Sequence, residues 1–244
     1  MTMPEDVHVE VLVSGGCPNA QAAVELGRAV AERLGPGTLL TRVEVDTPEQ
    51  AARLGFLGSP SFLVNGSDIE GKTTAAGALC CRTYADGHGL PPRWLLEAAV
   101  LRELRPRGLL FLCVANSARS QMAEGIARAL LPAEVRVWSA GSHPTRVRPE
   151  AIAALKEIGI DISGHRSKHV SDVPATAVDT VITLCDEEEC PVFLGDARRV
   201  HWGLPDPAAA GGSESERLDA FRRARDELRG RIAVLAGGNR REGQ

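Results

Sequence analysis

The sequence contains no apolar run that approaches the roughly 20 residues needed to cross a bilayer. Its N-terminus, MTMPEDVHVE, is acidic and lacks the apolar core of a signal peptide. A net charge of −4 gives no electrostatic footprint for nucleic acid. The 244 residues, 43% hydrophobic and 25% charged, are typical of a soluble globular protein of one or two domains. We therefore expect a cytoplasmic protein that binds neither a membrane nor nucleic acid.

Familiar cysteine motifs are also missing, since no pair shows Cys-x-x-Cys spacing and no Cys/His cluster has zinc-finger spacing. The chain nevertheless has six cysteines, at positions 17, 80, 81, 113, 185 and 190. In the cytoplasm such thiols are more often catalytic or metal-binding than paired in structural disulfides. Three lie before residue 102 and three after residue 108, which suggests two thiol chemistries.

The charged segment 102–108, RELRPRG, separates a helical pattern from a new apolar strand, and we place a domain boundary there. This boundary predicts a first domain over 1–105 and a second over 108–236, followed by a flexible tail over 237–244. Strands are expected at 7–13, 39–45 and within 58–66, and then at 109–114, 135–139, 178–184 and 199–202. Helices are expected at 18–34, 48–54 and 92–104, and then at 120–130, 149–158 and 214–235. This alternation predicts an α/β fold, with a parallel sheet covered on both faces in the second domain.

The stretch FLCVANSARSQMAEG, residues 111–125, runs from an apolar strand through a polar turn into a helix. Ligands of open parallel sheets bind outside the carboxyl ends of strands, where backbone N–H groups and a helix N-terminus attract anions. Arg119 adds a guanidinium suited to a tetrahedral oxyanion. Cys113 is therefore predicted to be a nucleophile facing an oxyanion, with Ser120 donating to its thiolate. The predicted anion-binding loop comprises Val114, Ala115, Asn116, Ser117, Ala118, Arg119 and Ser120.

A leaving oxygen also needs an acid, and HWGLPDPAAA, residues 201–210, holds Asp206 between two prolines after a predicted strand. Alone this pattern is a turn signal. Together with the anion-binding loop, it predicts Asp206 as the general acid.

These segments, with SAG at 139–141, ALKEIGIDISGHRS and VITLCDEEECPVF, resemble the thioredoxin-coupled arsenate reductases, which share the fold of the low-molecular-weight tyrosine phosphatases. The resemblance covers about residues 108–236 and implies reduction of arsenate to arsenite in arsenic detoxification. It implies that Cys113 attacks arsenate, that Arg119 and the 113–120 loop bind it, and that Asp206 protonates the leaving oxygen. Phosphate or sulfate would compete as anions.

The resemblance also implies a disulfide relay. Cys185 would attack Cys113 and release arsenite, and Cys190 would then attack Cys185. Thioredoxin or a similar thiol would reduce the resulting 185–190 disulfide. The alternative is a phosphatase acting on tyrosine phosphate or small phosphate esters, but Pro207 and three alanines follow Asp206 where such phosphatases place aromatic residues. A second alternative is a thiol-based metalloid-binding or sensor protein.

Two positions depart from the family pattern. Ala115 stands where the loop commonly has glycine, which is tolerable at negative φ. Lys168 occupies a position where some members use an acid to help hold potassium, and its ammonium group could replace the ion. We therefore expect no metal and no cofactor.

In the first domain, VLVSGGCPNA and GSPSFLV resemble the thioredoxin fold, with Cys17 at a helix start and Pro60 as the cis proline facing it. The usual second cysteine is replaced by Ala20. Cys81, ahead of Cys80, is the expected resolving thiol. Other interpretations are an inert Cys17, a structural Cys80–Cys81 pair, or capture of a soft metal. The domain would then be a built-in redox partner, a metalloid binder or only a docking module.

Overall fold

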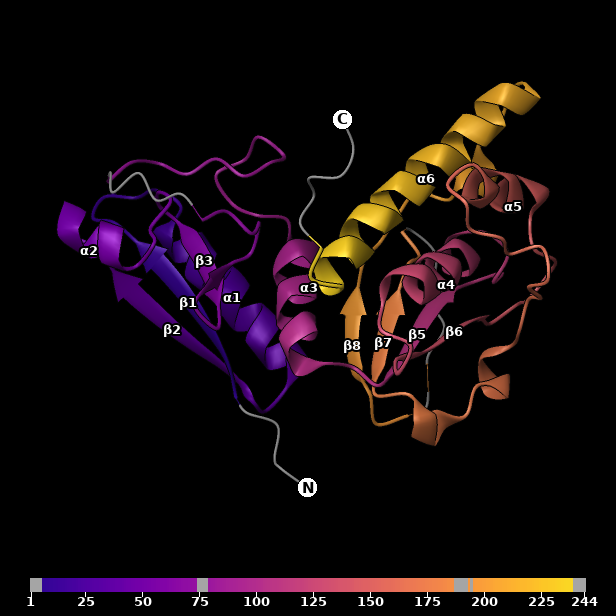
Figure 1. Cartoon of the computed structure of the whole chain (residues 1–244), viewed down its shortest axis with the longest axis horizontal. Helices are drawn as coiled ribbons and strands as arrows, with labels where there is room; N and C mark the ends of the chain where they lie inside the picture. Colours follow the sequence, from indigo (N-terminus) through magenta and orange to yellow (C-terminus); the bar gives the residue numbers. More distant parts are fainter. Residues whose placement is uncertain (1–5, 74–78, 187–192, 194, 239–244) are drawn as a thin grey trace. The chain divides into compact units, whose positions relative to one another are not determined.

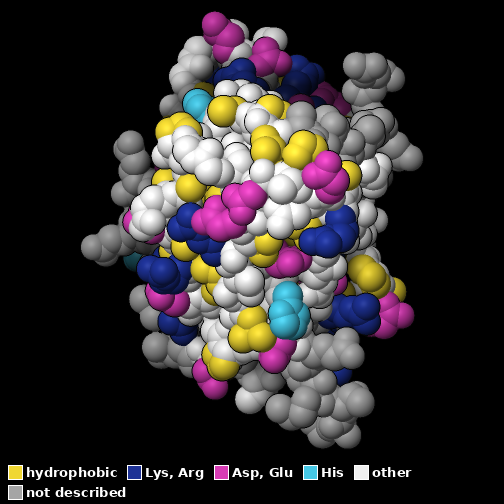
Figure 2. Space-filling model, turned by 90° about the vertical axis from the view of Figure 1, so that its left-hand side faces the viewer, with side chains coloured by type: hydrophobic (Ala, Val, Ile, Leu, Met, Phe, Trp, Pro, Cys, Tyr) yellow, Lys and Arg dark blue, Asp and Glu magenta, His cyan; other side chains and the backbone are white. Residues whose placement is uncertain are grey.

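The computed structural model describes residues 6–73, 79–186, 193 and 195–238. These residues divide into two compact units, with the division between Arg105 and Pro106. The predicted tail lies outside the described residues from position 239 onward, and Cys190 also lies outside them. None of the described helices combines the length and apolarity needed to cross a membrane. Acidic and basic side chains alternate over the face of the molecule drawn in Figure 2, in keeping with the small net charge.

The first unit is a mixed sheet with the strand order β2-β1-β3-β4. Strand β1 runs parallel to β2 and antiparallel to β3, and β3 and β4 form an antiparallel hairpin. Asn65 and Gly66 connect the hairpin strands with positive φ angles of 48° and 76°, as a tight two-residue turn requires. The elements, labelled in Figure 1, are β1 (Val7–Val13), α1 (Ala20–Leu34), β2 (Thr38–Glu44), α2 (Pro48–Arg53), β3 (Ser61–Val64), β4 (Ser67–Asp68) and α3 (Arg93–Leu104).

Helices pack on both faces of this sheet. Gly27 brings α1 against Val11 of β1, where an added Cβ would lie 3.2 Å from Val11 Cγ2. Leu12, the next residue of β1, points to the opposite face and packs with Ala51 of α2 and with Phe56. Helix α1 begins at Ala20 and not at Pro18 as predicted, because the Cys17 carbonyl accepts the Ala20 N–H in a tight turn (3.2 Å).

The second unit is a four-stranded sheet with the order β6-β5-β7-β8, in which every neighbouring pair is parallel, so the predicted parallel sheet is confirmed. All six residues of the central strand β5 are buried, as its unbroken apolar sequence predicts. The elements are β5 (Gly108–Cys113), α4 (Arg119–Leu130), β6 (Arg136–Gly141), α5 (Pro149–Lys156), β7 (Thr180–Thr183), β8 (Arg198–His201) and α6 (Glu214–Leu235). Short 3₁₀ turns lie at η1 (Val170–Asp172), η2 (Ala175–Ala177) and η3 (Pro207–Ala209).

The two faces of this second sheet are covered differently. Helices α4, α5 and α6 pack on one another, with α4 lying against β5 and β6 (Figure 1). Leu110 and Leu112 of β5 pack with Val173 and Val178, which flank the η2 turn. The segment that contains this short 3₁₀ turn therefore covers part of the sheet.

Parallel strands end at the same edge of a sheet, and this edge collects the predicted functional residues. Strand β5 ends at Cys113, β7 ends two residues before Cys185, and β8 ends five residues before Asp206. The topology therefore places three distant sequence segments together.

Candidate active site

Cys113 is the last residue of β5 and is only 3% exposed. Its Sγ lies 2.9 Å from Oγ of Ser120, in the first turn of α4. The Asn116 side-chain amide donates to the same Ser120 oxygen (2.9 Å), so the Ser120 proton is directed toward the sulfur. Ser120 is therefore placed to donate a hydrogen bond to the Cys113 sulfur.

The loop that follows Cys113 is held from its outer side by hydrogen bonds to its carbonyls. The Val114 carbonyl accepts from the His143 N–H (2.9 Å), Ala115 from Thr145 (3.0 Å), Asn116 from Ser167 Oγ (2.6 Å) and Ser117 from Arg148 (2.9 Å). Within a planar trans peptide unit the N–H points opposite to the C=O. The N–H groups of residues 115–118 therefore point toward the inner side of the loop, where an oxyanion would be bound.

The tight turn of this loop depends on Asn116, which has a φ of +45°. Its side-chain oxygen accepts hydrogen bonds from the Lys168 N–H (2.8 Å) and from Gln121 Nε2 (2.9 Å), which hold the left-handed backbone in place. Ala115 is not among the described non-glycine residues with positive φ, so alanine fits there without backbone strain. A Cβ added at Gly141 would lie 2.8 Å from the Asn116 nitrogen, so the loop also needs a glycine at the end of β6.

An ion cluster around the buried Glu124, which was not predicted from the sequence, lies behind the loop. Glu124 of α4 is 2% exposed and accepts hydrogen bonds from Ser139 Oγ and Lys168 Nζ (3.2 Å), while Arg128 Nη2 lies 2.5 Å from its other oxygen. Ser139 in turn accepts from the Asn116 amide (2.9 Å), so the cluster continues into the loop. The spacing of Glu124 and Arg128 on one helix face was the available signal. Because Lys168 already supplies the positive charge at Glu124, these residues do not fit a bound potassium ion.

Arg119 connects the loop to the other two strand ends. It is 3% exposed, and its Nη1 donates to the carbonyls of Leu184 (3.3 Å) and Leu204 (2.8 Å). Its Nη2 lies 3.7 Å from Oδ1 of Asp206. The Asp206 side chain is 35% exposed, and the same oxygen accepts the Ala208 N–H (3.2 Å). The guanidinium and the carboxyl group thus meet at the edge of the sheet, and the carboxyl group has access to solvent protons.

Cys185 is fully buried immediately beyond β7. Leu112 pairs with Thr183, and the Leu184 N–H donates to the Leu112 carbonyl (2.8 Å). Cys185 therefore lies one residue beyond the position opposite Cys113, on a strand spaced about 4.8 Å away. The structure thus places Arg119 beside Asp206, and the sheet register places the Cys185 segment next to the end of β5 that carries Cys113.

The first-unit thiols are more accessible than Cys113 and Cys185, the two second-unit thiols that the structure describes. Cys17 is half-buried, and Cys80 and Cys81 are exposed. The Ser59–Pro60 peptide bond is cis.

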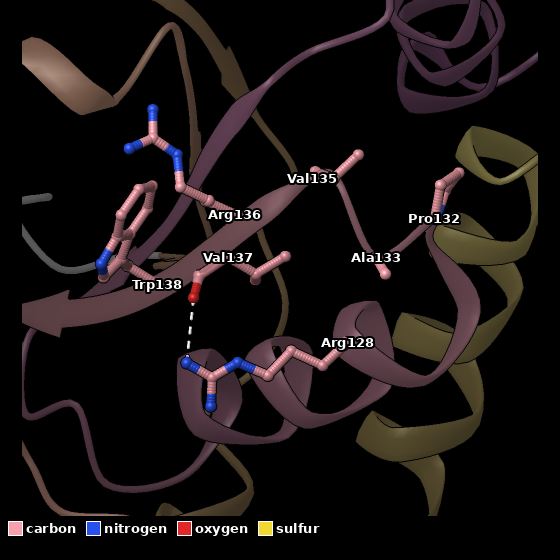
Figure 3. A pocket seen from close by; sticks show the side chains of 7 residues that line it. All are labelled: Arg128, Pro132, Ala133, Val135, Arg136, Val137 and Trp138. Carbon is pink, nitrogen blue, oxygen red and sulfur yellow. Dashed lines mark hydrogen bonds between the residues drawn. The ribbon is translucent and has the colours of Figure 1, made fainter.

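A separate hollow of about 380 Å³ lies between β6 and the end of α4 (Figure 3). Arg128 donates to the Val137 carbonyl across it (3.0 Å), and the Arg136 guanidinium lies 5.5 Å from the centre of the Trp138 ring. Its lining contains none of the predicted site residues. The hollow is thus distinct from the edge at which Cys113 lies.

Comparison with known proteins bears on the second unit. Residues 108–243 match the family described as low molecular weight phosphotyrosine protein phosphatase. Over 130 residues, the chain is 45% identical to an arsenate reductase of Halalkalibacterium halodurans and 42% identical to one of Bacillus subtilis. Each match spans 52% of this chain and 94% of the relative. A crystal structure of arsenate reductase from Archaeoglobus fulgidus matches with 28% identity and a TM-score of 0.47, over 53% of this chain and 98% of that one.

Proposed function

The chain belongs to the low molecular weight phosphotyrosine protein phosphatase family, and from this premise we propose that it reduces arsenate to arsenite. The similar proteins named above are arsenate reductases. The observation that carries the proposal is the position of Cys185. A phosphatase needs only one thiol at this sheet edge, whereas a reductase needs a second thiol to supply the electrons.

In the first step the Cys113 thiolate attacks the arsenic of arsenate. An As–S bond forms, an As–O bond breaks, and Asp206 protonates the leaving oxygen, which departs as water. The inward N–H groups of residues 115–118 and the Arg119 guanidinium hold the remaining oxygens. Phosphate has the same shape and charge and competes for the same groups.

In the second step the Cys185 thiolate attacks the sulfur of Cys113. An S–S bond forms, the As–S bond breaks, and its electron pair stays on arsenic, which leaves as arsenite. Cys190 then attacks Cys185 and frees Cys113. An external dithiol of the thioredoxin type reduces the 185–190 disulfide and closes the cycle.

The rival function is phosphatase activity, in which water cleaves the cysteinyl intermediate. The test compares arsenite formation, with thioredoxin, its reductase and NADPH, against hydrolysis of p-nitrophenyl phosphate. Cys185→Ser should stop arsenite release but retain any ester cleavage, because the first attack needs only Cys113. Cys80→Ser, at an exposed thiol of the other unit, is the matched control. Efficient ester hydrolysis without reductant, and with no arsenite formed from arsenate, would exclude the reductase.

We also propose a thioredoxin-like fold for the first unit. Its support is the strand order β2-β1-β3-β4, the antiparallel third and fourth strands, and a cysteine just before α1. The cis Ser59–Pro60 bond immediately before β3 agrees with this assignment.

A further inference from the structure

Two cysteine-bearing segments of the first unit meet at one residue, Ser59. Its Oγ accepts the Ser14 N–H (3.0 Å), and the Ser14 carbonyl accepts the Cys17 N–H (3.3 Å). On the other side, the Ser59 N–H donates to the Cys80 carbonyl (2.7 Å), and the Ser59 carbonyl accepts the Arg82 N–H (3.1 Å). The turn that carries Cys17 and the segment that carries Cys80 and Cys81 are therefore both fixed to Ser59. We propose that Cys17 and Cys81 form a redox pair that reduces protein disulfides.

The register selects Cys81 over Cys80. Ser59 and Cys81 form a parallel β-bridge, so their side chains point to the same side, the side on which Ser59 contacts Ser14. Residues on either side of Cys81 point the other way. Arg82 confirms this direction, because its guanidinium reaches Asp68 and Ser61, and Ser61 is paired with Leu12 on the face that packs against α2. Cys81 therefore points toward the α1 side of the sheet, where Cys17 precedes the helix.

A buried anchor holds the Cys81 segment in position. Arg82 is 4% exposed, and its two terminal nitrogens bind both oxygens of Asp68 (2.6 and 3.0 Å). Glu70 binds the same guanidinium (3.1 Å), and the Tyr84 ring lies 4.2 Å from it. The Tyr84 hydroxyl donates to the Pro60 carbonyl (3.0 Å), which ties the segment to the residue that follows Ser59. A rigid anchor next to an exposed thiol is the arrangement expected of a positioned resolving cysteine.

The pair is open to a macromolecular reactant. Cys17 is half-buried and Cys81 is exposed, in contrast to the fully enclosed Cys185. An open groove of about 520 Å³ is lined by Asn19, which lies two residues after Cys17 in the sequence, and by residues 86 and 88–92. In this proposal a polypeptide that carries a disulfide binds in the groove, beside the turn that contains Cys17.

The reaction balances with two thiols and one disulfide. The Cys17 thiolate attacks one sulfur of the reactant disulfide, forming a mixed disulfide and releasing the other sulfur as a thiolate. The Cys81 thiolate then attacks the Cys17 sulfur, forming the 17–81 disulfide and releasing the second thiolate. The reactant gains two electrons and, from water, two protons. A dithiol reductant restores Cys17 and Cys81. The identity of the reactant as the disulfide formed by the second unit rests on the proposed function. The Cys17–Cys81 pair does not depend on it.

The first test uses the full chain with Cys113→Ser, Cys185→Ser and Cys190→Ser, which keeps only the three first-unit thiols. After oxidation with diamide and alkylation, peptide mass spectrometry should find a peptide containing Cys17 linked to one containing residues 80–81. Adding Cys80→Ser should preserve this link and the reduction of insulin by dithiothreitol that the chain catalyses. Adding Cys81→Ser should remove the link and lower insulin reduction at least tenfold. A link that survives Cys81→Ser undiminished, or no link in the parent, would overturn the pair.

The second test addresses the reactant, in the chain with its second-unit thiols intact. With thioredoxin limiting, Cys17→Ser and Cys81→Ser should both slow arsenite formation, and Cys80→Ser should not. Equal rates in all three variants would refute the second unit as the reactant. If even the parent forms no arsenite, the proposed function fails while the insulin result still decides the 17–81 pair.

Discussion

Both units place a cysteine between a strand and a helix, yet the two turns differ in what they can bind. Cys113 ends β5 and is followed within six residues by Arg119, and its loop carbonyls are bonded outward. The turn SGGCPN at 14–19 contains no Lys or Arg, and Cys17 is half-buried. We therefore propose that the second unit holds a small oxyanion, whereas the first offers an accessible thiol beside another thiol-bearing segment. A strand–Cys–helix order alone does not determine the chemistry; the side chains that fill the turn do.

Removing each cysteine separately tests most strongly whether the two turns differ in chemistry. Cys113→Ser should abolish arsenate reduction, a loss of at least about 10³-fold, because no As–S bond can form. Cys17→Ser should leave the rate unchanged when thioredoxin is saturating, since its turn has no cation to bind arsenate. Arsenite formation measures both. Equal losses in the two variants would show that the turns share one reaction.

Replacing the proposed general acid, Asp206, should have the next largest effect on turnover. Asp206→Asn keeps the oxygen that accepts the Ala208 N–H but cannot donate a proton as a carboxylic acid does. Turnover should fall on the order of 10²–10⁴-fold, with proton transfer the step that slows. Single-turnover rates with arsenate check this. If product release is slowed and chemistry is not, Asp206 is not the acid.

Each unit also has an ion cluster around a buried charged side chain, Arg82 in the first and Glu124 in the second, and Lys168 tests the second. Lys168→Met removes one of the two cations that face Glu124 and leaves that buried carboxylate less well paired. The free energy of unfolding should fall by about 1–3 kcal/mol, and the KM for arsenate should rise because Asn116 is held less firmly. Urea denaturation and initial rates measure the two effects, with the exposed Lys156→Met as control. A variant as stable as the control would show that Arg128 alone suffices.

The smallest expected effect is a pH dependence of stability. It comes from the ion pairs that Glu157, at the end of α5, makes with Arg222 and Arg225 of α6. The hydrogen bond from Arg222, together with that from Arg225, outweighs burial and lowers the pKa of Glu157 from its usual 4.5 to about 2. A carboxyl group whose pKa is lowered on folding stabilises the fold above pH 4.5 and loses that contribution as the pH falls toward 2. Glu157→Gln should therefore flatten the urea midpoint against pH between 4.5 and 2. Glu134→Gln, at an exposed glutamate, should keep the slope of the parent.

The parallel sheet of the second unit, and the meeting of Cys113, Arg119 and Asp206 at its edge, could be predicted because strand ends and polar turns are local signals. The cluster around Glu124 was missed because it joins α4 to Ser139 and Lys168, which no periodicity connects. The start of α1 was misplaced for a local reason, since Pro18 lies inside the turn that the Cys17 carbonyl closes.

Cys81 was expected as a resolving thiol, but the contacts that support this role could not be predicted from the sequence. The pairing of Ser59 with Cys81 joins residues 22 positions apart through one isolated bridge, and the buried Arg82 anchor depends on acids from β4 and beyond. Such contacts follow from tertiary packing and not from propensity.

The most direct measurement of the central claim is the disulfide left after one turnover of the Cys190→Ser chain with arsenate. The proposed relay predicts one arsenite released per chain and a disulfide between Cys113 and Cys185. Mass spectrometry of the peptides, after alkylation without reductant, should find this disulfide. Arsenite released while Cys113 and Cys185 both remain alkylated, or no arsenite at all from a folded chain, would contradict it.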